Sequence, residues 1–295
     1  MIEKVTVTGH IALDFIFDIP YYPEKNHSIF IKHKEEHFGG GAANIAVGLA
    51  KLGCKSELIA TVDENFESSH YGLYLKNLGV ELNLKKFKGE LARAYIFNDE
   101  EQNQITYFYW GVSENMKHAG TNARDTVHIA PSHPGFACDM AENAKFLAFE
   151  PGQDIPRYKK EQLSFILDNT DILFCNNFEL KQIEKILELE KQKLLRQMDV
   201  VMTEGEKGSI LYSEGNKKRI PAVKANVVDP TGAGDAYKAA FWAGLIRGLD
   251  LETSCKLGSI ASSLVVKKRG AQSGLPDWDK LLELYEIHFE KAEKI

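Results

Sequence analysis

The stretch Val227-Val228-Asp229-Pro230-Thr231-Gly232-Ala233-Gly234-Asp235 leads from two strand-like valines into a long apolar helical pattern. Its small residues allow the N–H groups of Gly232, Ala233 and Gly234 to converge at the start of that helix, where the helix dipole favours negative charge. This pattern predicts a site for an anion such as a transferring phosphoryl group. Asp235 follows in the first turn, where a carboxylate can accept the proton of an attacking hydroxyl. The alternative, a simple helix-start acid, does not explain the glycines.

Short apolar runs alternate with helical patterns on both sides of this stretch. Runs such as residues 127–130 and 172–175 are typical of buried strands, and a helical pattern follows each of them. Strands that alternate with helices predict an α/β fold with a doubly wound, mainly parallel sheet and helices on both faces. In such sheets, ligands bind beyond the carboxyl ends of the strands.

Two segments interrupt the alternation. Residues 27–38 and 92–110 are strand-like without an intervening helix, and the second contains two aromatic-rich strands around a polar turn. They predict a small antiparallel sheet that lies over the α/β body and closes as a lid, with an ordinary edge extension as the alternative. We therefore expect a single domain over residues 1–295, with a β-lid formed by about 11–38 and 92–110.

Composition excludes several classes of function. The 295 residues are 44% hydrophobic and have a net charge of -6, which offers no basic surface for nucleic acid. No apolar run approaches the roughly 18 residues of a membrane helix, and the first residues do not resemble a signal peptide. We expect a cytoplasmic protein that binds neither nucleic acid nor membranes. The run His33-Lys34-Glu35-Glu36-His37 has the spacing of an inverted zinc-peptidase motif, but its flanks favour a strand over a helix.

Two motifs resemble those of a known family. Residues 229–235 resemble the C-terminal signature of the ribokinase-like (PfkB) carbohydrate kinases, and Gly39-Gly40-Gly41-Ala42-Ala43-Asn44 resembles their N-terminal signature. The two motifs lie in the family's order and at its spacing, and the resemblance extends from Val5 to about Pro276. It implies a ribokinase-like fold with a β-sheet lid, ATP as the phosphoryl donor and Mg²⁺ as the cofactor. It leaves open whether K⁺ also binds.

The resemblance also implies roles for individual positions on the acceptor side. Asp235 corresponds to the catalytic base, and the anion hole corresponds to Gly232, Ala233 and Gly234. The acceptor is expected to contact the following residues: Asp14, Gly39, Gly40, Asn44 and Gln153. A carboxylate at the position of Asp14 can accept both hydroxyls of a vicinal diol. Ordinary turn and helix-start roles stay open for Asp14 and Asn44.

On the donor side, the resemblance implies a second group of residues. ATP would be bound by Thr203, Gly205, Gly208, Thr231, Gly232, Gly234 and Ser259. Asn176 and Glu179 match the family's Asn-x-x-Glu motif, which holds Mg²⁺ largely through water. The same spacing is that of a helix capping box, which stays open as the alternative. Asp229 corresponds to a site for a monovalent cation.

Two positions that depart from the family pattern indicate which acceptor the protein binds. Ala12 and Gly41 stand where ribokinases typically have Asn and Lys, which disfavours free ribose as the substrate. Residues 9–14, 103–111 and 150–153 are more similar to the archaeal nucleoside kinases of the family. We therefore predict ATP- and Mg²⁺-dependent transfer of the γ-phosphoryl group to the 5'-hydroxyl of a ribose-containing acceptor, most of all a nucleoside. A ribokinase or other sugar kinase is one alternative, and a non-catalytic protein that binds sugars or nucleosides is another.

The aromatic residues of the second irregular segment have two possible functions. Phe108 and Trp110 could stack on a nucleobase or could pack the base of the lid. Alternation places the aromatic side chains of Tyr95, Tyr107 and Tyr109 on one side of their strands. Since relatives in the family often pair their lids, the resemblance implies a homodimer formed through the lid.

Overall fold

The computed structural model describes residues 2–101 and 103–290, and its central layer is a nine-stranded sheet in the order β13-β12-β11-β10-β9-β8-β1-β4-β5. The strands from β11 to β5 pair in parallel, whereas β12 and β13 are antiparallel at one edge. The strands of this sheet are β1 (Val5–Thr8), β4 (Ser56–Asp63), β5 (Glu81–Phe87), β8 (Arg124–Ile129), β9 (Ala144–Phe149), β10 (Ile172–Asn176), β11 (Asp199–Thr203), β12 (Ser209–Ser213) and β13 (Asn216–Ile220).

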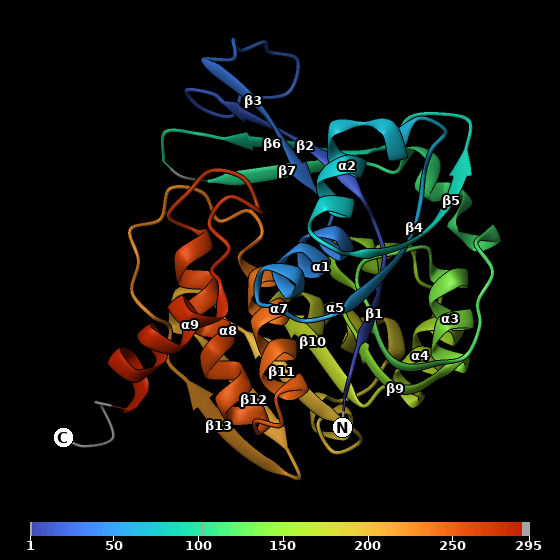
Figure 1. Cartoon of the computed structure of the whole chain (residues 1–295). Coiled ribbons are helices and arrows are strands. Elements are labelled where there is room, and N and C mark those ends of the chain that lie inside the picture. Colours follow the sequence, from blue (N-terminus) through green and yellow to red (C-terminus); the bar gives the residue numbers. More distant parts are fainter. Residues whose placement is uncertain (1, 102, 291–295) are drawn as a thin grey trace.

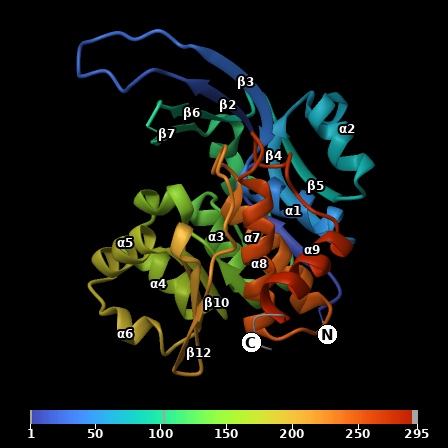
Figure 2. The same cartoon turned by 90° about the vertical axis from the view of Figure 1, so that its left-hand side faces the viewer.

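Helices cover both faces of the sheet, as Figure 2 shows. One face carries α3 (Pro134–Glu142), α4 (Lys160–Asp168), α5 (Asn177–Leu187) and α6 (Lys191–Leu194). The other carries α1 (Gly41–Lys51), α2 (His70–Asn77), α7 (Ala233–Ile246), α8 (Leu251–Val265) and α9 (Trp278–Tyr285). Two separate hydrophobic clusters correspond to these two faces. The doubly wound α/β fold predicted from the sequence is therefore confirmed.

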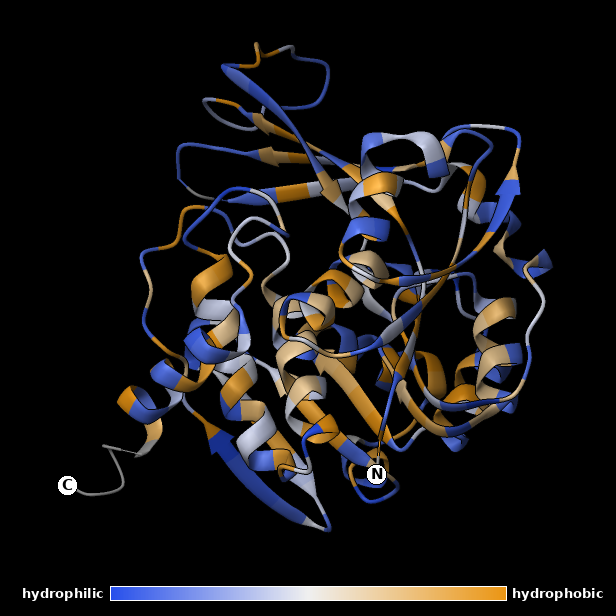
Figure 3. Ribbon diagram, in the orientation of Figure 1, coloured by the Kyte–Doolittle hydropathy of each residue, from blue (hydrophilic) through white to orange (hydrophobic). Residues whose placement is uncertain are grey.

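Burial explains the composition of the strands. All four residues of β1, Val5–Thr8, are buried, as expected for a strand covered by helices on both faces. The edge strand β13, in contrast, exposes its asparagine, lysines and arginine, and it is blue in Figure 3. Charged side chains on an edge strand oppose pairing with another chain. None of the helices in residues 2–101 and 103–290 is long and apolar enough to cross a membrane.

A second, four-stranded sheet lies above the carboxyl ends of the parallel strands, at the top of Figure 1. Its order is β3-β2-β6-β7, and its strands are β2 (Ala12–Asp18), β3 (His33–Gly39), β6 (Ala92–Asn98) and β7 (Gln104–Tyr109). The predicted segments thus form a separate sheet, but the prediction that it is antiparallel was wrong. The sheet consists of two antiparallel hairpins whose first strands, β2 and β6, lie side by side in parallel.

The bounds of this sheet also differ from those predicted. The strand expected over residues 27–38 begins only at His33, and the chain before it forms an irregular loop. Gln102, within the predicted lid, lies outside the described residues, as do residues 1 and 291–295 of the expected domain.

The strand-like reading of Val227 and Val228 was wrong as well. Residues 221–230 contain no strand, and both valines are largely exposed. The N–H of Val228 donates to the carbonyl of Val266 at 2.7 Å, at the end of α8. The physical reason is topological: β13 ends at the edge of the sheet, so the chain must cross over the strand ends to reach α7 and has no neighbouring strand with which to pair.

Short turns of 3-10 helix and one π-turn complete the described chain. The 3-10 turns are Phe66–Ser68, Gly111–His118, Gly152–Arg157 and Gly205–Lys207, and the π-turn is Glu286–Glu290. Three of these turns, Phe66–Ser68, Gly152–Arg157 and Gly205–Lys207, follow parallel strands of the central sheet, so they lie at the edge of the sheet where the candidate site lies.

Candidate active site

The N-terminus of α7 is built around Gly232, which caps the helix with φ of 79°. A Cβ at this position would lie 2.4 Å from the Cβ of Ala271, so both the left-handed backbone and the close packing require glycine. The N–H of Ala233 donates to the carbonyl of Pro230 at 3.2 Å, whereas Gly234 is exposed on the same turn. The predicted anion hole is thus an open helix start in which the N–H of Ala233 is engaged with its own turn.

Asp235 follows this turn and is held from two sides. Asn44, in the first turn of α1, donates from Nδ2 to Asp235 Oδ2 at 2.8 Å. The Nζ of Lys238 lies 3.4 Å from Oδ1. Burial raises the pKa of Asp235, and the nearby Lys238 ammonium opposes that rise. The carboxylate is therefore a stronger proton acceptor than an exposed aspartate, and its two oxygens have different partners.

Lys238 belongs to a buried charged network that we did not predict. Its ammonium forms an ion pair with Glu150, which directly follows β9. Burial alone would raise the pKa of Glu150, but Lys238 outweighs it and brings the value down to about 2. Beyond Glu150, His128 lies 3.6 Å away and accepts a hydrogen bond from Trp242 Nε1 at 2.9 Å. Two signals were available: a lone lysine in an apolar helical run, and an acid at the end of a buried strand.

The predicted acceptor residues Asp14, Gly39 and Gly40 come together at the base of the lid, near the start of β2 and the end of β3. Asp14 is buried in β2, and burial, followed by the charges of Asp235 and Asp229, raises its pKa to about 8. A Cβ on Gly39 would lie 2.1 Å from Asp14 Oδ1. A Cβ on Gly40, whose φ is 92°, would lie 2.5 Å from the backbone carbonyl of His10, in the connection between β1 and β2. Gly39 is therefore required so that the chain can pass next to the carboxyl group, and Gly40 so that it can pass next to the backbone at His10.

Gln153 is placed differently from the other predicted acceptor residues. It is exposed in the turn Gly152–Arg157, whereas its neighbour Asp154 is a buried side chain of that turn. Asp154 accepts a hydrogen bond from Trp110 Nε1 at 3.1 Å, and its other oxygen lies 2.8 Å from His10 Nε2. The sequence offered no signal for Asp154 beyond its position after a buried strand.

On the other side of the α7 N-terminus lies a cavity of about 1030 Å³. Five of the seven predicted ATP-binding residues line it, namely Thr203, Gly205, Gly208, Gly234 and Ser259, as does Ala233 of the predicted anion hole. Thr231 and Gly232 are not among its lining residues. Ser259 also donates from its hydroxyl to the carbonyl of Pro221 at 2.8 Å, which fixes the irregular chain along the cavity wall. The five predicted ATP-binding residues, which come from three separate segments, therefore share one cavity.

Two acidic positions were predicted to lie near cations. Glu179 forms a reciprocal capping box with Asn176, since each side chain accepts from the other residue's N–H, at 2.9 and 3.0 Å. Burial and then the charge of Glu150 raise the pKa of Glu179. Asp229 accepts from the N–H and the hydroxyl of Thr231 with one oxygen and from the N–H of Gly270 with the other. The capping alternative is thus observed, and Asp229 joins two loops.

Two further features concern metal ions. Across residues 2–101 and 103–290, no group of three or more His, Cys, Asp and Glu side chains is arranged to hold one. In the zinc-peptidase-like run, His33 and His37 lie on strand β3, not on a helix, and their Nε2 atoms lie 2.8 and 2.7 Å from the two oxygens of Glu35. The strand predicted from the flanking residues is confirmed.

The fold and the two signature motifs define a class of phosphoryl-transfer proteins. The family model of the pfkB family carbohydrate kinases matches residues 2–278, and the chain belongs to this family.

Several members of the family are similar over nearly the full length. A nucleoside kinase of Methanocaldococcus jannaschii is 41% identical, covering 97% of this chain and 98% of that protein. A crystal structure of the nucleoside kinase from that organism superposes with a TM-score of 0.89, covering 97% of this chain and 99% of the other. A nucleoside kinase of Methanothermobacter thermautotrophicus is 37% identical over 93% of each chain. The structure of a Burkholderia thailandensis nucleoside kinase in complex with inosine has a TM-score of 0.88 at 25% identity, over 97% of this chain and 99% of that one.

Proposed function

We propose that this protein transfers the γ-phosphoryl group of ATP to the 5'-hydroxyl of a nucleoside. One observation carries the proposal: Asp235 lies at the helix start that separates the donor-side cavity from the buried carboxyl group of Asp14. A base at that position can reach a hydroxyl held on one side while the N-terminus of α7 receives the phosphoryl group from the other. The nucleoside is favoured over a free sugar because relatives at 41% and 37% identity are nucleoside kinases.

Different side chains of the site bind the substrates and transfer the proton. Asp235 accepts the proton of the attacking hydroxyl, and the N–H groups of Gly232 and Gly234 stabilise the negative charge on the transferring group. Asp14 holds the ribose hydroxyls, and Gly39 and Gly40 leave room for the sugar next to the backbone. Asn44 keeps the carboxylate of Asp235 oriented.

The carboxylates around the phosphate site fit a hydrated Mg²⁺. Burial and then the charge of Glu150 raise the pKa of Glu179, and a divalent cation bound there would counteract that rise. Mg²⁺ retains several waters, so Asn176 and Glu179 would hold it through its water shell and not as a dense ligand set. Bound there, the ion would neutralise charge on the phosphates. Asp229 is a candidate for the periphery of a K⁺ site, although hydrogen bonds from Thr231 and Gly270 already engage both of its oxygens.

The lid would supply contacts to the nucleobase. Phe108 is partly buried next to His10, with ring centroids 4.8 Å apart, and is the better placed of the two predicted stacking residues. Trp110 is buried, with the Arg157 guanidinium 3.5 Å from its ring centroid, which favours the packing alternative. Gln153, exposed near this region, is proposed to reach the base when the lid closes. The single-domain organisation with this lid, a lid-mediated homodimer and a cytoplasmic location also stay predictions.

A coupled assay of ADP release tests the proposal. Purified protein with ATP and Mg²⁺ should turn over nucleosides at least about tenfold faster, in kcat/KM, than ribose or hexoses. Asp235→Asn, which keeps the shape but cannot take the proton, should lose about 10²-fold or more in kcat while ATP binding persists. Preferred turnover of a free sugar would favour the ribokinase alternative. Tight nucleoside binding without ADP release would favour the non-catalytic one.

A further inference from the structure

A chain of buried hydrogen bonds connects the end of lid strand β3 to Asp235. The hydroxyl of Tyr71, on α2, donates to the carbonyl of Gly39 at 2.8 Å. Gln272, in the loop after α8, donates from Nε2 to the Tyr71 oxygen and to Asn44 Oδ1, both at 2.8 Å. Asn44 in turn donates to Asp235. The segments that meet here, α1, α2, α7 and the loop leading to α9, surround the lower end of the lid in Figure 1.

The direction of every bond in this chain follows from its first member. The carbonyl of Gly39 can only accept, so the single proton of the Tyr71 hydroxyl points toward it. The Tyr71 oxygen must then accept, which turns the NH₂ group of Gln272 toward it. The second N–H of the same group meets Asn44 Oδ1 and thereby turns the NH₂ group of Asn44 toward Asp235. A backbone carbonyl thus determines the orientation of two side-chain amides.

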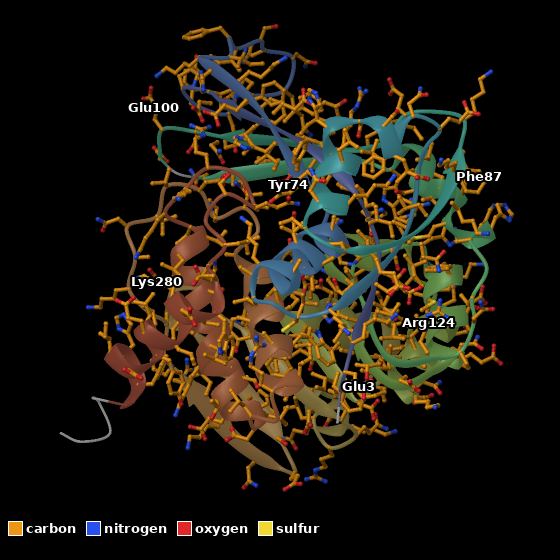
Figure 4. The ribbon with its side chains drawn as sticks, viewed as in Figure 1. Glu3, Tyr74, Phe87, Glu100, Arg124 and Lys280 are labelled. Carbon is orange, nitrogen blue, oxygen red and sulfur yellow. The ribbon has the colours of Figure 1, made fainter. Side chains whose placement is uncertain are left out.

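Because the side chains of this hydrogen-bond chain are buried, each of them depends on its protein partners for hydrogen bonds. Tyr71, Asn44 and Gln272 are exposed by only 2%, 4% and 7%, so water does not substitute readily for a missing partner. Tyr74, one turn further along α2 and labelled in Figure 4, packs with Phe38, and both line a neighbouring cavity of about 400 Å³ that Gln272 also borders. Within the described residues, Gln272 Oε1 is buried without a hydrogen-bond partner. An unpaired buried oxygen is unfavourable, so the hydrogen bonds of this side chain in the buried network are those that its NH₂ group donates.

The orientation of the Asn44 amide makes the two carboxylate oxygens of Asp235 different from each other. Asn44 occupies Oδ2, which leaves Oδ1, next to Lys238, as the oxygen that can take a proton from a substrate hydroxyl. If the Asn44 amide turned over, its oxygen would face the carboxylate and repel it. The carboxylate of Asp235 therefore favours the NH₂ side of Asn44, and Gln272 holds the same orientation from the other end by donating to Oδ1.

We propose that Gln272 is a positioning residue for the proton transfer, acting through Asn44 to engage Oδ2 of Asp235, so that Oδ1, which lies 3.4 Å from Lys238 Nζ, is the oxygen that takes the proton. The proposal rests on the proposed function only in taking Asp235 as the base. It does not depend on which sugar or nucleoside carries the hydroxyl.

Two substitutions separate this role from packing. Gln272→Glu has the same shape but offers only acceptor oxygens when ionised, so it should turn the Asn44 amide over and lower kcat by about 10²-fold. Gln272→Met fills similar volume without any donor and should lower kcat by about tenfold. In both variants the KM values for ATP and for the acceptor should stay within about threefold of wild type. Lys51→Met is the matched control, because Lys51 donates to the main-chain carbonyl of Gln272 and not to its side chain, and its kcat should be unchanged.

The outcomes are distinct. A purely structural role predicts lower melting temperatures with wild-type kcat in the folded variants, and that result overturns the proposal. So does equal loss of kcat in Lys51→Met and Gln272→Met. If Gln272→Glu does not fold, the Gln272→Met variant still decides.

A wild type that turns over neither nucleosides nor sugars contradicts the proposed function instead. The positioning role is then judged from a high-resolution crystal structure of Gln272→Met. Loss of the contact between Asn44 and Asp235 supports it, and retention of that contact overturns it.

Discussion

The protonation states of single side chains at this site depend on the carboxyl groups that lie close to Lys238. Its ammonium contacts both Asp235 and Glu150, and the charge of Asp235 in turn raises the pKa of Asp14. In a buried environment such charges act strongly on one another, because little water screens them. The protonation of each group therefore depends on the presence of its neighbours, and substitutions at this scale should show characteristic pH dependences.

Asp14 should make acceptor binding pH-dependent. Since its pKa is about 8, the carboxyl group of the free protein is mostly protonated at neutral pH, and only the ionised form can accept two hydroxyls. Acceptor affinity, measured by calorimetry without ATP, should therefore rise as the pH increases from 6 through 8 and then level off. Asp14→Ala should weaken binding by about 2–4 kcal/mol with little change in ATP binding.

Asp14→Asn serves as the control for this prediction. It keeps the size of the side chain next to Gly39 but does not titrate, so its weaker binding should be flat with pH. A pH dependence that persists in Asp14→Asn would assign the effect to another group.

Glu150 and Lys238 should shift the acid limb of kcat/KM in opposite directions. The base must be ionised to work, so activity falls as the pH drops through the pKa of Asp235. Glu150→Gln removes a negative neighbour, lowers the pKa of Asp235 and moves the acid limb to lower pH. Lys238→Met removes a positive neighbour, raises the pKa of Asp235 and moves the acid limb to higher pH. Lys238→Met also leaves a buried carboxylate unpaired and should destabilise the fold by about 3–5 kcal/mol.

The exposed ion pair of Lys145 and Asp125 provides the reference for these variants. Lys145→Met should change neither the melting temperature nor the pH profile. Shifts of the same sign in Glu150→Gln and Lys238→Met would show that the two residues act on the fold and not on the charge of Asp235.

At the scale of elements, the start of α7 is the feature on which the site depends. Gly232→Ala forces a Cβ into the left-handed region and against Ala271, so it should destabilise the fold by about 2–4 kcal/mol and displace the anion-binding turn. A displacement of about 1 Å should lower kcat by about 10²-fold. Unfolding by urea and steady-state kinetics on the same preparation would measure both.

Gly215 offers a matched control for that substitution. It has a similar φ of 76° in the turn between β12 and β13, but a Cβ there meets nothing within 4 Å. Gly215→Ala should therefore cost about 1 kcal/mol for the backbone alone and leave kcat unchanged. Equal stability losses in the two variants would mean that the contact with Ala271 is unimportant.

At the scale of the whole molecule, the lid leaves an apolar face uncovered. Phe15 stacks on Tyr95 and Phe17 on Phe97, with ring centroids 5.6 and 4.9 Å apart, on the side of the sheet opposite Asp14. On the same side, Tyr107 is 63% exposed. Apolar residues gathered on one exposed face are typical of an interaction surface. The two-fold pairing of lids proposed above would bury this face.

Tyr107→Glu should therefore dissociate the proposed dimer. Two carboxylates brought together at a two-fold interface repel each other, and the unsupported lid should also raise the acceptor KM. Light scattering at the assay concentration and the kinetics of the same sample are the measurements. Phe165→Glu, on α4, is the control and should change neither the mass nor the KM. A wild type that is monomeric and fully active would refute the lid dimer.

Local sequence determined the elements and the motif chemistry. Alternating buried runs predicted the parallel sheet, and the Gly-Ala-Gly run predicted the start of α7, because periodicity and backbone freedom act over a few residues. The capping box of Asn176 and Glu179, which stood as the alternative to a Mg²⁺ site, is visible in the same local spacing. These helix starts and caps form between residues that are close in the sequence, so the local sequence is enough to predict them.

Only the tertiary structure decided which distant side chains meet. Gln272 reaches Asn44 across 228 positions, and Lys238 reaches Glu150 from the other side of the strand ends, so no local pattern indicates either contact. The same holds for the parallel pairing of β2 with β6 and for the absence of a strand at Val227, since both depend on where the edges of the sheets lie. Burial of the two hydrophobic clusters fixes the positions of the helices relative to the sheet. The polar groups that are buried with them then form hydrogen bonds and ion pairs with the groups that this packing places next to them.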